Sequence, residues 1–319
     1  MEYEKLGSTD LTVSKLGFGC WAIGGHGYGP VDDDESVSAI RRALDHGVTL
    51  FDTADAYGFG HSERVLAKAL GARRKDVAIA TKFGVAWNES GETFRDCSPA
   101  RAVSSLEGSL KRLEIDCVPI YQIHWHDGKT PIGDTIEALK RCQQAGKIRH
   151  ISCSNFPLAL IHEAQAHQRI ESLQCLYSLL QRQNEADMIS CRESYNMGVI
   201  AYGTIVRGLL SAKFNVGTPG FIAGDTRGSS EMFKGMNFTR GVEAAELLKD
   251  IGCRYGKNSV QVAIRYVLQK SFVTAVIVGH KLAEQVDVNV RALGWNLDEE
   301  DMCLLDEYAC RHREMQVSP

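Results

Sequence analysis

The stretch TLFDTADAYG, from Thr49 to Gly58, decides the fold that we expect for this chain. With Val48 before it, its first three residues form a short apolar run, which predicts a buried strand. Asp52 stands where that strand would leave the core, and Tyr57 follows in a loop ahead of a helix-like segment, 61–70. In α/β barrels, chemistry is carried by strand ends and the loops after them. The pair is therefore a candidate site, although a capping acid and a loop tyrosine would look the same.

The composition is that of an ordinary globular protein, and it argues against several classes. Of the 319 residues, 44% are hydrophobic and 24% are charged, and the net charge is −4. The basic residues are dispersed, which argues against a nucleic-acid groove or a polybasic membrane patch. No apolar run approaches the roughly 18 residues of a membrane span, and the opening MEYEKLGSTD is unlike a signal peptide. We therefore expect a cytoplasmic protein with neither a nucleic-acid nor a membrane partner.

The ten cysteines indicate a reducing compartment. No two of them form a CxxC pair, and Cys20, Cys153 and Cys175 lie inside apolar runs. We expect small buried apolar side chains, and neither a disulfide framework nor a zinc site.

Strand and helix patterns alternate along the chain. Apolar strand candidates recur at 16–21, 49–53, 77–82, 117–124, 148–153, 173–177, 198–202 and 275–278. A segment with helical character follows each of them, and such alternation predicts a parallel sheet. Eight units favour closure into a (β/α)8 TIM barrel over the competing open, doubly wound sheet. Because no linker divides the chain, we expect a single domain over residues 1–319.

Two helices are marked by apolar stripes and by their first residues. The stripes are Val103, Leu106, Leu110 and Leu113 in the first helix and Ile132, Ile136, Leu139 and Cys142 in the second. Ser98-Pro99 and Thr130-Pro131 predict a capping residue followed by a first-turn proline. The acidic run 32–35 predicts the start of a further helix, which should end near His46.

The remaining segments complete the expected barrel. Residues 3–14 predict a hairpin around the turn Gly7–Asp10, and 298–312 predict a closing helix. A glycine-rich loop, 24–30, follows the first strand. Two long connections, Gly84–Cys97 and Gly203–Thr239, follow the third and seventh strands, so both should lie at the C-terminal face of the barrel, where long loops are usually functional.

Three consecutive strands end in residues that suit one reaction. After Asp52, the next two strand candidates end at Lys82 and His124. Pairing Asp52 with Lys82 would offset the cost of burying either charge. Free tyrosine titrates near ~10, and a neighbouring ammonium favours tyrosinate, so Lys82 would make Tyr57 a better general acid. His124 could donate a hydrogen bond to a developing alkoxide. His124 alone would more often be a satisfied core histidine.

These residues resemble the aldo-keto reductase family. The matching motifs are Gly-Phe-Gly-Cys-Trp at 17–21, Phe51–Gly58 with Glu63, Thr81-Lys82, Tyr121–Trp125, Ser154-Asn155-Phe156 and Gln174. The resemblance runs in order from Tyr3 to about Leu293, and it favours the microbial-type sugar and small-aldehyde reductases over the steroid-converting branch. It implies a barrel whose bottom is plugged by the N-terminal hairpin. It also implies a catalytic tetrad of Asp52, Tyr57, Lys82 and His124, with Tyr57 as the proton donor.

The resemblance also implies a nicotinamide cofactor bound without a Rossmann fold, and no G-x-G-x-x-G occurs in the sequence. The implied cofactor residues are Gly19, Cys20, Trp21, Asp52, Ser154, Asn155, Gln174, Tyr202, Gly203, Thr204, Ile205, Arg207, Gly208, Leu209, Gly279, His280, Lys281, Gln285 and Asn289. Among them, Ser154, Asn155 and Gln174 would hold the carboxamide, and Tyr202 would stack on the nicotinamide. Lys281 would pair with a 2′-phosphate, which favours NADP (NADPH), with NAD possible; a solvated surface lysine is the plainer alternative.

The implied substrate is a small carbonyl or alcohol compound. Trp21, Trp87 and Trp125 are candidates for the wall of its pocket, with Tyr57 and His124 at the reacting end, although each tryptophan could equally be ordinary packing. The sequence leaves open whether the chain is a monomer or a homo-oligomer.

Two other functions compete with a reductase. His124 and His126 could present two imidazoles to a metal in a barrel hydrolase, but only His280 would fit as a further ligand, and we expect no metal. Some proteins that resemble this family are cofactor-sensing subunits, as the potassium-channel β subunits are. Turnover of a simple aldehyde separates such a subunit from an enzyme.

Overall fold

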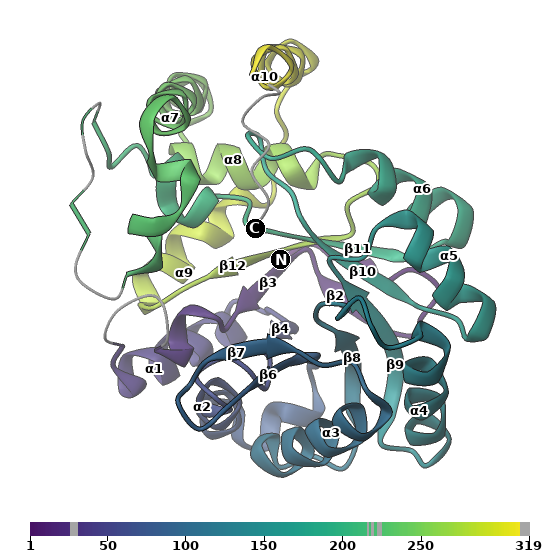
Figure 1. Ribbon diagram of the computed structural model, residues 1–319. Helices are drawn as coiled ribbons and strands as arrows, with labels where there is room; N and C mark the ends of the chain where they lie inside the picture. Colours follow the sequence, from purple (N-terminus) through teal and green to yellow (C-terminus); the bar gives the residue numbers. More distant parts are fainter. Residues whose placement is uncertain (26–30, 216, 218–219, 222–224, 313–319) are drawn as a thin grey trace.

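The structure, a computed structural model, describes residues 1–25, 31–215, 217, 220–221 and 225–312. Eight parallel strands form a closed barrel with helices around it (Figure 1). The strands are β3 (Leu16–Gly19), β4 (Leu50–Asp52), β5 (Ala78–Phe83), β8 (Val118–Ile123), β9 (Ile148–Ser154), β10 (Ser172–Leu176), β11 (Gly198–Tyr202) and β12 (Ala275–Gly279). Because β12 pairs with β3, from Val276 opposite Leu16 to Gly279 opposite Gly19, the sheet is closed and the TIM barrel is confirmed.

The helices form the outer layer of the molecule. They are α1 (Asp33–Asp45), α2 (His61–Leu70), α3 (Pro99–Leu113), α4 (Ile132–Gln144), α5 (Leu158–His167), α6 (Glu185–Tyr195), α7 (Gly235–Tyr255), α8 (Ser259–Leu268), α9 (Ala283–Asn289) and α10 (Glu299–Arg311). Short 3-10 turns η1 (Ala22–Gly24), η2 (Gly71–Lys75), η3 (Val206–Ser211), η4 (Thr226–Ser229), η5 (Glu231–Phe233) and η6 (Val290–Ala292) join them. The alternation is less regular than we expected, because β11 is followed by two helices, α7 and α8.

Of the three helix starts predicted from capping residues, two are confirmed. Asp32 caps α1 by accepting from the backbone N–H groups of Asp34 and Glu35, as the acidic run predicted. Ser98 caps α3 ahead of Pro99, as predicted. The prediction for α4 was wrong by one residue, because Pro131 occupies the cap position and the Thr130 hydroxyl donates to Asp127 Oδ2 instead, at 2.7 Å.

The apolar stripe of α3 is narrower than predicted. Leu106, Leu110 and Leu113 are buried, but Val103 is 39% exposed. At 100° per residue, the centre of the buried face passes through Leu106 and Leu113, and Val103 lies at its edge. All four apolar positions of the α4 stripe are buried, as predicted.

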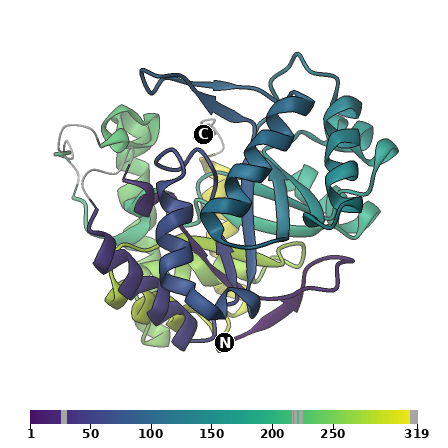
Figure 2. The same cartoon turned by 90° about the horizontal axis from the view of Figure 1, so that it is seen from below.

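The N-terminal hairpin closes one end of the barrel, as expected. β1 (Tyr3–Lys5) pairs with β2 (Thr12–Ser14), and Leu6 and Val13 pack inside the barrel against residues that include Ile120 and Ile200. Gly7 has a φ of +56°, and a Cβ on it would overlap the backbone of Gly198, so glycine is required at this approach. Figure 2 shows this hairpin in purple and the hairpin after β5 in dark blue at opposite ends of the barrel.

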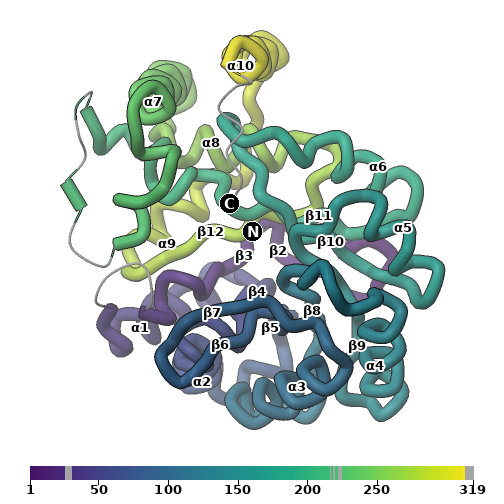
Figure 3. The backbone as a smooth tube through the Cα atoms, in the orientation of Figure 1, coloured from purple at the N-terminus to yellow at the C-terminus, as the bar shows by residue number. Residues whose placement is uncertain are grey.

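Both long connections carry structure that the sequence pattern did not predict. Within Gly84–Cys97, β6 (Val85–Trp87) pairs antiparallel with β7 (Thr93–Arg95). The second connection contains η3, η4 and η5, and α7 already begins at Gly235, ahead of the predicted boundary at Thr239. Figure 3 shows the described parts of this connection on the same side of the molecule as α7. Most of the glycine-rich loop 24–30 lies outside the described residues.

Candidate active site

The ends of β4 and β5 bring three of the four predicted catalytic side chains together. Lys82 Nζ lies 2.6 Å from Asp52 Oδ1 and 3.3 Å from the Tyr57 hydroxyl. It also donates to the backbone oxygen of Thr53 at 2.8 Å, so its three donors face three oxygens. Lys82 is fully buried and Asp52 is 4% exposed. Breaking such a buried pair costs about 3–5 kcal/mol, because one charge then remains uncompensated.

His124 follows β8 and completes the group. Its ring lies edge-on to the Tyr57 ring, with centroids 5.7 Å apart. Burial, then the charges of Lys82 and Arg95, hold the pKa of His124 well below its usual range. The imidazole is therefore neutral at neutral pH. Its Nδ1 is buried and makes no hydrogen bond to any described residue, so this ring has hydrogen-bonding capacity to spare.

The loop that carries Tyr57 packs closely on the loop after β3. Gly58 has a φ of +59°, and a Cβ there would overlap the carbonyl oxygen of Gly24. This approach brings Trp21 beside Tyr57, with ring centroids 6.3 Å apart. Two glycines that looked like ordinary loop residues thus set the position of the phenol.

The three tryptophans of the predicted substrate wall lie in three separate connections, after β3, β5 and β8. Trp21 lies beside Tyr57, Trp87 packs against Phe59 at 5.4 Å, and Trp125 follows His124 directly. Each also has an arginine over its ring: Arg207 over Trp21, Arg101 over Trp87 and Arg95 over Trp125. The sequence analysis named Arg207 as a cofactor residue, but it did not single out Arg95 or Arg101.

The residues predicted to face a nicotinamide also lie together. Asn155 Nδ2 donates to Ser154 Oγ at 2.9 Å and to the backbone oxygen of His124 at 3.1 Å, and the Tyr202 hydroxyl donates to Asn155 Oδ1 at 2.8 Å. Gln174 Nε2 donates to Asp52 Oδ1 at 2.7 Å, which ties this group to the buried ion pair.

The loop after β11 has an unusual backbone. Val206, Arg207 and Gly208 have φ values of 49°, 51° and 91°. The left-handed region is rarely adopted by a β-branched residue such as Val206, so the loop is locally strained. The Thr204 hydroxyl is buried without a hydrogen-bond partner among the described residues. Ile205 and Gly203 are half-buried, and Leu209 is fully buried.

The predicted adenosine end follows β12. The Lys281 side chain is half-buried, and burial together with the charge of Arg227 lowers its pKa. The sequence analysis missed Arg227, a second cation here, because it lies in the long connection after β11. Gln285 Oε1 accepts from the backbone N–H groups of Lys281 and Leu282, at 2.7 and 3.3 Å, so a side chain already satisfies the start of α9.

Several predicted cofactor residues turn their side chains into the interior. Cys20 is fully buried in the cluster between the barrel and α1, and His280 is buried against Phe18, with ring centroids 4.9 Å apart. Burial lowers the pKa of His280 to about 3, so the ring is neutral. Asn289 is buried as well. Gly19 and Gly279, which pair across β3 and β12, have no side chain to offer. Any cofactor contact of Cys20, Gly19 and Gly279 would be through the backbone.

Comparison with known proteins agrees with this arrangement. The model of the aldo/keto reductase family matches residues 15–309. The chain belongs to this family. It is 35% identical over 304 residues to the aldo-keto reductase YhdN of Bacillus subtilis, covering 94% of this chain and 91% of that protein. It is 31% identical over 319 residues to the NADH-specific methylglyoxal reductase of Escherichia coli, covering 95% and 97%.

A solved structure shares the whole fold. The glycerol dehydrogenase AKR11B4 of Gluconobacter oxydans superposes with a TM-score of 0.90 at 34% identity, over 99% of this chain and 98% of that one. The chain is thus an aldo-keto reductase of bacterial type, an oxidoreductase that reduces carbonyl compounds.

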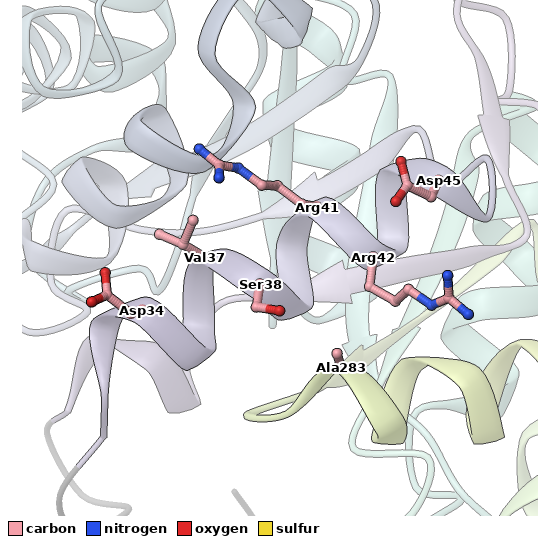
Figure 4. A pocket seen from close by; sticks show the side chains of 7 residues that line it. All are labelled: Asp34, Val37, Ser38, Arg41, Arg42, Asp45 and Ala283. Atoms are coloured by element: carbon pink, nitrogen blue, oxygen red, sulfur yellow. The ribbon is translucent and has the colours of Figure 1, made fainter.

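A groove away from the barrel mouth contains none of the candidate residues of this aldo-keto reductase. It encloses about 360 Å³ between α1 and the start of α9 (Figure 4). Its lining is Asp34, Val37, Ser38, Arg41, Arg42, Asp45 and Ala283. Arg42 is already paired with Asp287 and Asp34 with Lys68, at 2.6 and 3.1 Å. We therefore place no chemistry there.

The two histidines considered as metal ligands do not converge. β8 ends at Ile123, and His126 turns away to contact the Thr130 backbone oxygen at 2.9 Å and the Gly128 N–H at 3.1 Å. In the part of the chain that the structure describes, no group of three or more His, Cys, Asp or Glu side chains could hold a metal ion. Of the helices in that same part, none combines the length and apolarity needed to cross a membrane.

The cysteine prediction holds for most but not all positions. Cys20, Cys97, Cys142, Cys153, Cys175 and Cys191 are buried free thiols. Cys253, Cys303 and Cys310 are exposed, on α7 and α10, which the apolar-run argument did not cover.

Proposed function

We propose that this aldo-keto reductase uses NADPH to reduce an aldehyde or ketone, a sugar or a small carbonyl compound, to the alcohol, or runs the reverse reaction, with Tyr57 as the proton donor. The observation that carries the proposal is the position of Lys82 Nζ, which contacts both Asp52 and the Tyr57 hydroxyl. The whole chain would act as one barrel domain. The cytoplasmic location and the absence of nucleic-acid and membrane partners stay predictions.

Each member of the tetrad has one task in this mechanism. Tyr57 protonates the carbonyl oxygen, and the Lys82 ammonium stabilises the negative charge that develops on the phenol oxygen. Asp52 compensates the charge of Lys82 in the interior. His124, held neutral, donates a hydrogen bond to the substrate oxygen and orients it towards the phenol. A nicotinamide held by Ser154, Asn155 and Gln174 would supply the hydride for the carbonyl carbon.

The residues around the barrel mouth suit a nicotinamide dinucleotide. Ser154, Asn155 and Gln174 offer the amide and hydroxyl groups that a carboxamide needs. The Thr204 hydroxyl, which has no hydrogen-bond partner in the part of the chain that the structure describes, and the charge of Arg207 lie in the loop that we assign to the pyrophosphate. Lys281 and Arg227 supply positive charge where a 2′-phosphate would bind.

Replacing the phenol tests the proposed function. Tyr57→Phe should lower kcat/KM for carbonyl reduction by about 10²–10⁴-fold, because that is what a positioned general acid contributes. NADPH affinity, followed by fluorescence, should stay near that of the parent. Tyr195→Phe, at the end of α6, is the matched control and should leave turnover unchanged.

Methylglyoxal and, for the reverse reaction, glycerol are the first compounds to test, since relatives are named for them. Unchanged reduction by Tyr57→Phe would refute the assignment; no reduction by the parent would favour a cofactor-sensing subunit.

Cofactor preference has its own test. Lys281→Ala should weaken NADPH binding by about tenfold and leave NADH binding unchanged, since only NADPH carries the phosphate that this charge would meet. The ratio of the two dissociation constants is the measurement. A ratio equal to that of the parent would show that Lys281 does not read the 2′-phosphate.

A further inference from the structure

Two buried carboxylates lie on the outer side of the loop that carries Tyr57, facing α3. Glu63 is fully satisfied: the Thr81 hydroxyl donates to its Oε1 at 2.6 Å and Arg112 Nε to its Oε2 at 2.5 Å. Asp55 is not. Its Oδ2 accepts from Arg101 Nη2 at 2.7 Å and from the Ser105 hydroxyl, but its Oδ1 is buried without a partner among the described residues.

The Asp55–Arg101 pair is costly as a purely structural feature. Asp55 is 1% exposed, and Arg101 Nε is likewise buried without a partner among the described residues. Removing a charge from water without satisfying its hydrogen bonds opposes folding. A partly satisfied ion pair of this kind is typical of a functional position rather than of a stabilising one.

The pair connects the proton donor to the substrate wall. Asp55 precedes Tyr57 by two residues, and its N–H donates to the backbone oxygen of Lys82 at 3.3 Å. Arg101 lies over the Trp87 ring at 5.0 Å and donates to the Val85 backbone oxygen at 3.4 Å. Through these contacts Arg101 links the β6–β7 hairpin to Asp55.

The contacts of Asp55 and Arg101 lead back, through Trp87, to the loop that carries Tyr57. Trp87 packs against Phe59, which lies two residues beyond Tyr57 in the same loop. The Tyr57 loop, Asp55, Arg101 and Trp87 therefore form a ring of contacts beside the candidate active site.

We propose that Asp55 is a positioning residue whose carboxylate, by holding Arg101, keeps Trp87 and the β6–β7 hairpin against the Tyr57 loop, so that the ionisation of Asp55 sets the affinity for the carbonyl substrate. The inference rests on the proposed function, since it concerns the substrate pocket of that same site. Asp55 acts on the substrate only through Arg101 and Trp87.

The ionisation of Asp55 changes in an accessible pH range. Burial raises the pKa of Asp55 to about 6, and the Ser105 hydrogen bond and Arg101 oppose that rise. The other groups that face it are Glu63 from α2, Arg112 from α3 and Tyr121 from β8, whose pKa burial and the charge of Asp55 both raise. Below pH 6 the carboxyl is neutral and its hold on Arg101 weakens.

The test compares Asp55→Asn with a matched control. Asp55→Asn copies the neutral carboxyl, so at pH 8 it should raise the KM for a carbonyl substrate about tenfold, change kcat less, and leave NADPH affinity unchanged. In the parent, KM should fall as the pH rises through 6, and in Asp55→Asn this change should be absent. The control is Asp301→Asn on α10: Asp301 is a buried acid that also accepts from an arginine, Arg254, and a hydroxyl, Tyr255. It should leave KM and its pH profile unchanged.

A second variant gives an answer even if Asp55→Asn folds poorly. Ser105→Ala removes a hydrogen bond that favours the ionised form of Asp55, so the pH at which KM changes should move upwards. An unmoved midpoint, or a parent-like KM and pH profile in Asp55→Asn, would overturn the positioning role while carbonyl reduction by the parent still stood. No reduction of any carbonyl by the parent, with either cofactor, would instead overturn the proposed function and this inference with it.

Discussion

Asp52 ends β4 and Asp55 lies three residues further on, in the loop that follows, and the two acids have different surroundings. Asp52 points into the barrel, where its Oδ1 accepts from Lys82 and from Gln174. Asp55 points outward to α3, where Arg101 and Ser105 share one of its oxygens and the other has no partner among the described residues. Both side chains are buried. The difference shows that burial alone does not assign a role: Asp52 forms a buried ion pair with Lys82, whereas Asp55 is only partly hydrogen-bonded and burial raises its pKa to about 6.

The largest effect on kcat/KM is expected from Lys82, the partner of Asp52. Lys82→Met should lower kcat/KM by about 10³–10⁴-fold, because the phenol loses the charge that favours proton transfer. It should also lower the free energy of unfolding by about 3–5 kcal/mol, since Asp52 is left buried and uncompensated. Steady-state kinetics and urea unfolding measure the two effects. Lys111→Met, exposed on α3, is the control; activity of Lys82→Met within tenfold of the parent would contradict the role of Lys82.

Asp52→Asn should have a smaller effect than Lys82→Met. The amide keeps the shape of the side chain, and Lys82 keeps its contacts to the Thr53 oxygen and the Tyr57 hydroxyl. We expect a loss of about 10–10²-fold in kcat/KM, because Lys82 still faces the phenol but loses its countercharge. Comparing kcat/KM of the two variants at one pH makes the measurement. A larger loss in Asp52→Asn would mean that the carboxylate itself takes part in proton transfer.

The surroundings of Asp52 could be predicted from the sequence, but those of Asp55 could not. Asp52 ends β4, Lys82 is the last residue but one of β5, and His124 directly follows β8. The ends of neighbouring parallel strands meet, so the proximity of these residues could be predicted from spacing. Asp55 stands in the same quoted stretch, but its partner Arg101 lies on a helix 46 residues later. No periodicity links a loop acid to a helix arginine, and the tryptophan between them could not be told from ordinary packing.

The same reasoning explains the mistakes elsewhere. Strands of three residues, such as β6 and β7, are too short to show alternation, so the hairpin that presents Trp87 was taken for a loop. Arg227 lies in a connection whose path depends on tertiary contacts, and only the structure brings its charge near Lys281. The barrel itself was predictable because eight repeats of one pattern constrain it far more than one loop does.

The smallest effect is expected on the free energy of unfolding, through the ionisation of Asp55. With a pKa of about 6 against 3.8 for the unfolded chain, native Asp55 keeps its proton in a window where the unfolded chain has lost it. The free energy of unfolding should therefore fall as the pH rises through that window, by about 1–2 kcal/mol between pH 5 and pH 8 from this group. Asp55→Asn should lack this part of the pH dependence. Urea unfolding of both proteins at pH 5 and pH 8 measures it, and equal pH dependence in the two would show that Asp55 does not titrate here.

The central claim is that Lys82 acts on the substrate through Tyr57, and a double-mutant cycle in kcat/KM tests it most directly. The four proteins are the parent, Tyr57→Phe, Lys82→Met and the double variant, measured with one carbonyl substrate and NADPH. If Lys82 works through the phenol, removing it from Tyr57→Phe should lower kcat/KM little further, because residues that act as a unit are not additive. Losses that multiply in the double variant would contradict the account, since Lys82 would then contribute to turnover independently of Tyr57.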